Sequence, residues 1–170
     1  LDADVIIFDP HKLKICDSFE YAFGREYWVQ ENKNYSSLKV YHNVHNAICL
    51  FQKSNPFLEF YIHACEKIIS SSLGTVPNQI VGTKFLTALH NIINFNLIES
   101  VGMTSPLVLR DIASGGGPAL KRLNYASKVP LGAVNLCSSL IATEVDGVNI
   151  SADLMLTVCE NLCQRGLILD

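Results

Sequence analysis

Runs of apolar residues between polar segments predict several short strands in this chain. Residues 5–8 are four consecutive apolar residues followed by an Asp-Pro pair, which predicts a fully covered strand. Residues 47–51 predict a second strand on the same grounds. Two shorter strands are expected at residues 26–30 and 39–41, on either side of a polar loop at residues 31–37.

Apolar residues at helical spacing predict helices in the middle of the chain. Asn55 and Pro56 are typical of an N-cap and a first turn. The helix that they begin is expected to run to Gly74 and to face the core. The next helix is predicted near residues 81–91, and its expected buried side chains are Phe85, Leu86, Leu89 and Ile92.

The last third of the chain predicts three more helices and a hairpin. The expected elements are a helix from Ser105 to near Gly115, a helix at 118–126, a strand within 134–145, a hairpin turn at Asp146 and Gly147, and a helix from Ser151 to near Gly166. The glycine run at residues 115–117 lacks the pattern of a phosphate-binding loop. It is therefore interpreted as a plain interhelix loop.

Composition narrows the class of protein. The chain has 170 residues, 49% of them hydrophobic, which suffices to bury a core, and no stretch is apolar enough to span a bilayer. A net charge of -3 with scattered basic residues argues against a nucleic-acid groove. The cysteines form neither a Cys-x-x-Cys pair nor a disulfide pattern, and Cys159 with Cys163 lacks the partners of a metal site.

Asp2 and Asp4 stand one residue apart at the start of the first predicted strand. Residues i and i+2 of a strand point to the same side, so both carboxylates can present oxygens to one hard divalent cation. Two carboxylates beside a core strand repel each other unless a cation or hydrogen-bond donors offset them. The alternative is that the pair caps a turn or faces water.

Three motifs then resemble one family. Residues 1–5, Leu-Asp-Ala-Asp-Val, resemble the signature of glycosyltransferases with a DXD-containing sugar-binding region, which include α-1,4-galactosyl-, N-acetylglucosaminyl- and α-1,6-mannosyltransferases. Residues 44–51 are similar to the family's Asn-Ala-hydrophobic strand. Residues 78–87 are similar to its Gly-Pro-x-Leu-Leu-Thr helix start, with Thr83 in place of Pro. The order of the three motifs is more specific than any one of them.

The resemblance implies an α/β fold of the GT-A type, in which a mixed sheet is flanked by helices. Residues 1–95 would be the sugar-binding core, and residues 96–170 a helical and hairpin part of the same domain. The family places its DXD motif after a nucleotide-binding half. The chain is therefore expected to lack that half and any upstream membrane anchor, and to be inactive alone. Relatives act in the Golgi lumen or in the bacterial cytoplasm, so the compartment stays open.

The implied reaction moves a hexosyl or N-acetylhexosaminyl group from a nucleoside diphosphate sugar to a glycan, glycolipid or glycoprotein acceptor, with retention of configuration. By resemblance, Asp4 would bind Mn2+ or Mg2+, and Asp2 would bind the cation or the donor's ribose. Asn46 would donate to a sugar hydroxyl or the diphosphate, or else satisfy backbone groups. Gly82 would let a sugar approach the backbone, or else serve packing.

The roles of four further residues, and one difference from the family's pattern, leave alternative interpretations open. His42 and His45 could reach the metal, although ordinary hydrogen bonding is favoured. Trp28 and Tyr27 fit a sugar stack or, preferably, a buried core. Many relatives carry a late metal-binding His, whereas no His follows His90 here. A noncatalytic carbohydrate-binding or scaffold module, and a metal-independent interaction domain, therefore remain as rival interpretations.

Overall fold

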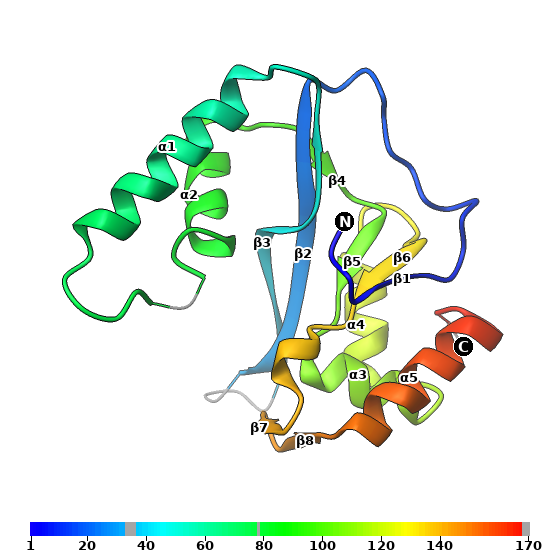
Figure 1. Ribbon diagram of the computed structural model, residues 1–170. Helices are drawn as coiled ribbons and strands as arrows, with labels where there is room; N and C mark the ends of the chain where they lie inside the picture. Colours follow the sequence, from blue (N-terminus) through cyan, green and yellow to red (C-terminus); the bar gives the residue numbers. More distant parts are fainter. Residues whose placement is uncertain (33–36, 78, 168–170) are drawn as a thin grey trace.

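The computed structural model describes residues 1–32, 37–77 and 79–167 (Figure 1). These residues form an α/β fold of short strands, five α-helices and one 3-10 helix. The strands are β1 (Val5–Ile7), β2 (Tyr21–Asn32), β3 (Ser37–Phe51), β4 (Leu97–Ile98), β5 (Val101–Met103), β6 (Ala133–Asn135), β7 (Thr143–Val145) and β8 (Val148–Ile150). The helices are α1 (Pro56–Ser71), α2 (Thr83–Ile93), α3 (Pro106–Ala113), α4 (Pro118–Ala126), the 3-10 helix η1 (Ser138–Leu140) and α5 (Ala152–Arg165).

The strands of the described residues form three small sheets. In one, β1 is antiparallel and β5 is parallel to the central β6. In the second, β3 is antiparallel and β4 is parallel to the central β2. The third is the β7–β8 hairpin. The segments 1–95 and 96–170 therefore both contribute strands to each of the two larger sheets.

The long β2–β3 hairpin runs through the middle of the molecule (Figure 1). The sequence predicted only short strands here. The strands are continuous because Tyr27 and Val29, both fully buried on one face of β2, pack into the core that also contains residues of α3 and α4. The middle of the expected polar loop, residues 33–36, lies outside the described residues.

The register of the hairpin changes near one end. Gly24 is opposite His45, but the preceding residue Phe23 is opposite Cys49. Residues 46–48 therefore have no register partner on β2, and this insertion is a β-bulge. The predicted strand at residues 47–51 is in fact the end of β3, which the bulge interrupts.

The cap predicted for α1 is confirmed. Asn55 Oδ1 accepts a hydrogen bond of 3.0 Å from the amide of Phe57, and a proline follows at the first helical position. The helix ends at Ser71, three residues before the expected glycine. The prediction that it faces the core is only partly right, because no residue of α1 is fully buried. Its half-buried side, with Phe57 and Tyr61, packs against an aromatic cluster around Phe23.

The neighbouring helix α2 lies between α1 and the hairpin (Figure 1). Leu86 is fully buried and Phe85 and Leu89 are half-buried, close to the expectation. The prediction that Ile92 is buried is wrong, because it is 79% exposed. The helix starts at Thr83 rather than residue 81 and ends at Ile93.

The local predictions for the last third are confirmed. Ser151 Oγ accepts from the amide of Leu154 at 3.1 Å and caps α5, which Gly166 terminates. Asp146 (φ 52°) and Gly147 (φ 71°) form the two-residue turn between β7 and β8. The strand expected within residues 134–145 corresponds to β6 and β7.

The glycine run at residues 115–117 connects α3 to α4. The buried carboxylate of Asp111 lies at the start of α4, where its Oδ2 accepts from the amides of Ala119 at 2.7 Å and Leu120 at 3.1 Å. A Cβ on Gly117 would lie 2.3 Å from Asp111 Cγ. The glycine run is therefore an interhelix loop, as the sequence indicated, and the structure adds that Gly117 lets Asp111 pack closely.

The first predicted strand exists as β1, but it is not fully covered. Among the described residues it pairs with β6 alone and lies at the edge of its sheet, and Ile7 is 44% exposed. None of the described helices is long and apolar enough to cross a membrane.

Candidate functional site

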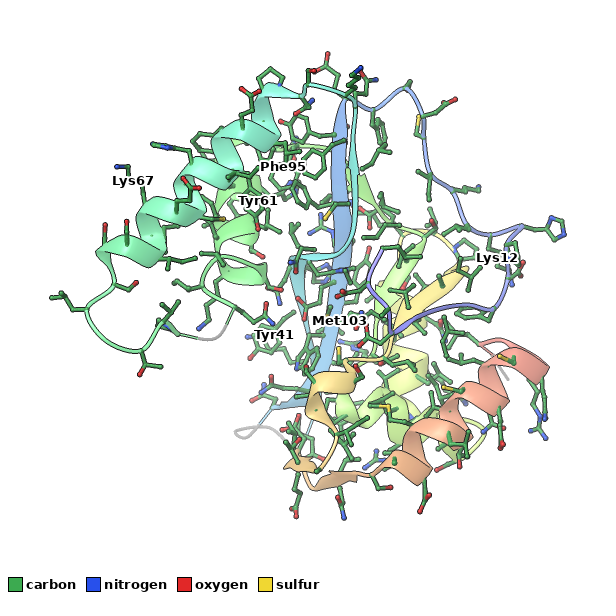
Figure 2. The ribbon with its side chains drawn as sticks, in the orientation of Figure 1. Lys12, Tyr41, Tyr61, Lys67, Phe95 and Met103 are labelled. Atoms are coloured by element: carbon green, nitrogen blue, oxygen red, sulfur yellow. The ribbon has the colours of Figure 1, made fainter. Side chains whose placement is uncertain are left out.

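An open cleft of about 1220 Å³ separates the β2–β3 hairpin and the start of α2 from the segments around β1, β6 and η1. Figure 2 labels Tyr41 on β3 and Met103 on β5 near the centre of the molecule, and both line this cleft. The side chains that carry polar chemistry there are Asp2, Asp4, Glu26, Trp28, Gln30, Tyr41, Asn43, Asn46, Gln79, Thr83, Lys84, Thr87, Asn135, Cys137, Ser138 and Ser139.

The structure places Asp2 and Asp4 together on the wall of this cleft. Both acids precede β1: Asp4 lies in the turn before the strand, and Asp2 lies just before that turn. The expectation that they share a strand face is therefore wrong, because neither belongs to a strand. Asp2 is exposed. Its backbone amide donates a hydrogen bond of 2.7 Å to the carbonyl of Ala47. The chain before β1 is therefore attached to the β3 bulge.

The same bulge presents Asn46 to the cleft. Asn46 is exposed and lines the cleft, whereas its neighbours His45 and Ala47 are buried. A β-bulge commonly redirects one side chain beside a functional site, because its inserted residues are not paired with the neighbouring strand. The carbonyl of Ala47 thus connects β3 with the segment that carries both acids, and the side chain of Asn46 lines the same cleft as that segment.

Gly82 is not among the residues that line the cleft, but it lies directly behind them. It is buried and precedes α2. A Cβ there would lie 2.6 Å from Gln79 Oε1 and 3.6 Å from Asn46 Oδ1. The missing side chain therefore allows Gln79, which lines the cleft, to approach the start of the helix, whereas Asn46 would be only in van der Waals contact.

The carboxylate of Asp4 is held by three donors. Oδ1 accepts from Asn135 Nδ2 at 2.6 Å, and Oδ2 accepts from the amide and the hydroxyl of Ser138, both at 2.8 Å. Burial alone would raise the pKa of Asp4, but the hydrogen bonds from Ser138 and Asn135 outweigh it and hold the pKa below its ordinary value. Asp4 is thus kept ionised and fixed in orientation.

These donors limit how Asp4 can bind a cation. A carboxylate offers about four lone-pair positions. Three are used on Asp4, so one position on Oδ1 remains. Mg2+ commonly takes one or two carboxylates and completes its shell with water and substrate phosphates. Asp2, which is exposed, and the free position of Asp4 fit that kind of site.

No larger ligand set is found in the structure. Within residues 1–32, 37–77 and 79–167, no group of three or more His, Cys, Asp or Glu side chains is arranged to hold a metal ion. His45 is fully buried, and burial lowers its pKa to about 4. His42 is exposed and packs edge-on against Tyr27. Neither histidine lines the cleft.

Several residues that line the cleft were not predicted from the sequence as site residues. Glu26 is only 5% exposed, and burial raises its pKa to about 7, although a hydrogen bond with Asn43 acts in the opposite direction. Alternation with a period of two could have placed Glu26, Trp28 and Gln30 on one face of β2. Tyr27 occupies the other face, where it is buried. Trp28 is half-buried and lines the cleft, so the expectation that it belongs to the core is wrong.

Cys137 is the thiol that lines the cleft. Burial raises its pKa to about 12, and Glu26 and Asp4 add to this effect. It is therefore a neutral thiol at physiological pH, and it is not activated as a nucleophile.

Comparison of the chain with protein-family models, with curated proteins and with solved structures gave no match. Its function is therefore inferred from its own residues and from the geometry of the cleft.

Proposed function

We propose that this chain is the sugar-binding part of a metal-dependent glycosyltransferase with a GT-A-like arrangement. It would transfer a hexosyl or N-acetylhexosaminyl group from a nucleoside diphosphate sugar to a glycan, glycolipid or glycoprotein acceptor. The observation that carries the proposal is that Asp2, Asp4 and Asn46, from two distant segments, line one open cleft of about 1220 Å³. A cleft of this size can hold a sugar and a diphosphate together.

The charges of the cleft suit this donor. Asp2 and Asp4 would hold Mn2+ or Mg2+, which supplies Lewis-acid stabilisation of the departing diphosphate. Lys84, exposed at the first turn of α2, is the cation among the described residues that line the cleft, and it would attract the same diphosphate. Asn46 would donate a hydrogen bond to a sugar hydroxyl or to a phosphate oxygen.

A second candidate function is a noncatalytic carbohydrate-binding module. The absence of a third acidic or histidine ligand among the described residues favours it. In that case the polar and aromatic side chains of the cleft would bind a sugar without a cation. The two candidates differ in one measurable property, which is whether binding needs a metal.

Isothermal titration calorimetry of the complete protein with Mn2+, in the presence and absence of UDP or GDP, tests the proposal. Manganese uptake should be stronger with a nucleoside diphosphate present. Asp2→Asn and Asp4→Asn should each weaken it by about tenfold or more. Asp17→Asn, an exposed acid outside the cleft, is the matched control and should change nothing.

Circular dichroism of each variant checks that the fold persists. The glycosyltransferase proposal is wrong if neither nucleotide promotes manganese uptake by the unsubstituted complete protein. Sugar binding that is indifferent to chelators would then support the noncatalytic module. In the complete protein, Asp4→Ala should abolish metal-dependent sugar transfer.

A further inference from the structure

One face of the β2–β3 hairpin forms a continuous wall of the cleft. Cross-strand register places Glu26 opposite Asn43 and Trp28 opposite Tyr41. All four line the cleft, together with Gln30. Paired residues on antiparallel strands share a face, so the wall presents a polar pair beside an aromatic pair. This wall is separate from the segment that carries the two aspartates.

The polar pair contains an unsatisfied group. Glu26 is 95% buried, and its Oε2 is shielded from solvent with no hydrogen-bond partner in the described part of the chain. Asn43 hydrogen-bonds to the carboxyl and so fixes it. Leaving a buried polar atom unpaired is costly, and such atoms are rare in folded proteins. Because Glu26 lines the cleft, a ligand toward which its carboxyl turns would supply the missing partner and recover that cost.

A sugar hydroxyl is a suitable partner for this group. A hydroxyl both donates and accepts, and a carboxyl with a pKa of about 7 can do the same at physiological pH. A phosphate oxygen is not a suitable partner for Glu26 itself, because it has no proton to donate and its charge repels a carboxylate. A neutral polar ligand is therefore the better match for this wall.

The aromatic pair completes the match. Trp28 is half-buried and Tyr41 is 37% exposed, so parts of both rings are open to the cleft. Lys39 Nζ lies 4.3 Å from the centroid of the Tyr41 ring, which leaves Trp28 as the better stacking surface. An aromatic ring buries the apolar C–H face of a pyranose, while neighbouring polar groups bind its hydroxyls.

We propose that the cleft-facing side of the β2–β3 hairpin is a pyranose-binding wall, in which Trp28 stacks on the ring and Glu26, held by Asn43, hydrogen-bonds one ring hydroxyl. The inference rests on the proposed function for the class of ligand. It assigns sugar recognition to residues other than Asp2 and Asp4. The pyranose comes either from the donor or from the acceptor, and the chemistry is the same.

Trp28 is the single tryptophan of the chain, so its fluorescence reports on this wall directly. The chain is titrated with methyl pyranosides of galactose, glucose, mannose and N-acetylglucosamine, and separately with UDP, GDP and their sugar conjugates in Mn2+. A change of emission with a methyl pyranoside identifies an acceptor sugar. A change with a sugar nucleotide, but not with the bare nucleotide, identifies the donor sugar.

Glu26→Gln and Glu26→Ala then test the hydroxyl contact. Glu26→Ala should weaken binding of the responding sugar by about tenfold or more, and Glu26→Gln, whose amide still donates and accepts, should weaken it less. Affinity for the bare nucleotide with Mn2+ should be unchanged in both variants. Glu144→Gln, an exposed acid on β7 outside the cleft, is the control. A series of deoxy sugars should include one analogue that binds the unsubstituted chain and Glu26→Ala equally, because the hydroxyl that Glu26 contacts is missing.

The two proposals fail in different ways. If manganese and nucleotide bind but no sugar changes the Trp28 emission, or Glu26→Ala binds sugars as the unsubstituted chain does, the pyranose wall is wrong and the metal site stands. If sugars bind through Trp28 and Glu26 but manganese never binds, the wall stands and the glycosyltransferase proposal is wrong.

Discussion

The side-chain amide of Asn135 donates a hydrogen bond of 2.6 Å to Oδ1 of Asp4, joining residues 131 positions apart in the chain. The contact exists because β6 ends at Asn135, where it pairs with the first residue of β1. Asn135 Oδ1 in turn accepts from the amide of Cys137 at 2.8 Å. One buried asparagine therefore fixes both the first acidic segment and the turn that leads into η1.

Asn135→Ala should destabilise the protein by about 1–3 kcal/mol, because it leaves the part-buried amide of Cys137 without its partner and removes one donor from Asp4. It should also raise the pKa of Asp4 and weaken manganese binding. Urea unfolding followed by Trp28 fluorescence measures the stability. Asn149→Ala, an exposed asparagine on β8, should stay within about 0.5 kcal/mol of the unsubstituted chain, and equal losses for both variants would contradict the role of Asn135.

Gly24→Ala should destabilise the hairpin by about 1–3 kcal/mol, through overpacking against His45. A Cβ at residue 24 would lie 2.2 Å from His45 Cε1, and His45 is fully buried. A double-mutant cycle with His45→Ala checks the cause. Once the imidazole is gone, Gly24→Ala should cost little more, and additive losses would show that the ring is not the obstacle.

Glu26→Gln should stabilise the protein at pH 8 and have little effect at pH 4. The pKa of Glu26 is raised from 4.5 to about 7, mainly by burial, so the folded chain keeps a proton that the unfolded chain releases. The protonated carboxyl of Glu26 stabilises the folded state fully below pH 4.5, and this stabilisation is lost as pH rises through about 7. The loss in the free energy of unfolding is about 3 kcal/mol.

The free energy of unfolding is measured against pH for the unsubstituted chain and for Glu26→Gln. The difference between these two curves isolates the effect of Glu26. His45, whose pKa is lowered by burial from 6.5 to about 4, destabilises the fold as pH falls through that window and so opposes Glu26. The difference should grow from pH 4 to pH 7 and then stay constant. A difference that does not depend on pH would mean that Glu26 is not kept protonated by the fold.

Asp111→Ala should destabilise the protein by about 2 kcal/mol, because the amides of Ala119 and Leu120 lose the carboxylate that caps α4. Guanidinium unfolding measures the change. Asp111→Asn should be intermediate, since an amide oxygen can still accept but carries no charge. Asp17→Ala, in an exposed loop, should be neutral, and a neutral Asp111→Ala would show that the start of α4 is satisfied otherwise.

Helix ends could be predicted well because their causes are local. Asn55 and Ser151 each cap a helix through a side chain that accepts from an amide two or three residues later, and Gly166 ends α5. The two-residue turn at Asp146 and Gly147 likewise depends on residues that tolerate positive φ. Each of these interactions involves residues only a few positions apart in the sequence.

The interior of the hairpin was harder to predict. Glu26 looked like the start of a short strand, and Trp28 like a core residue, because no local pattern states which face of β2 meets the cleft. That face is fixed by Tyr27 and Val29, which pack against helices more than seventy residues further along the chain. The bulge at residues 46–48 is equally non-local, since it depends on a register between two strands.

The sequence by itself determined where most helices begin and end, the β7–β8 turn, and the presence of two carboxylates close together at Asp2 and Asp4. Only the tertiary structure decided that these carboxylates share a cleft with Asn46, that three donors hold Asp4, and that Glu26 is buried beside Trp28. Caps and turns follow from interactions between neighbours in the chain. A cleft is made by strands paired across more than a hundred residues, and its lining follows from their register.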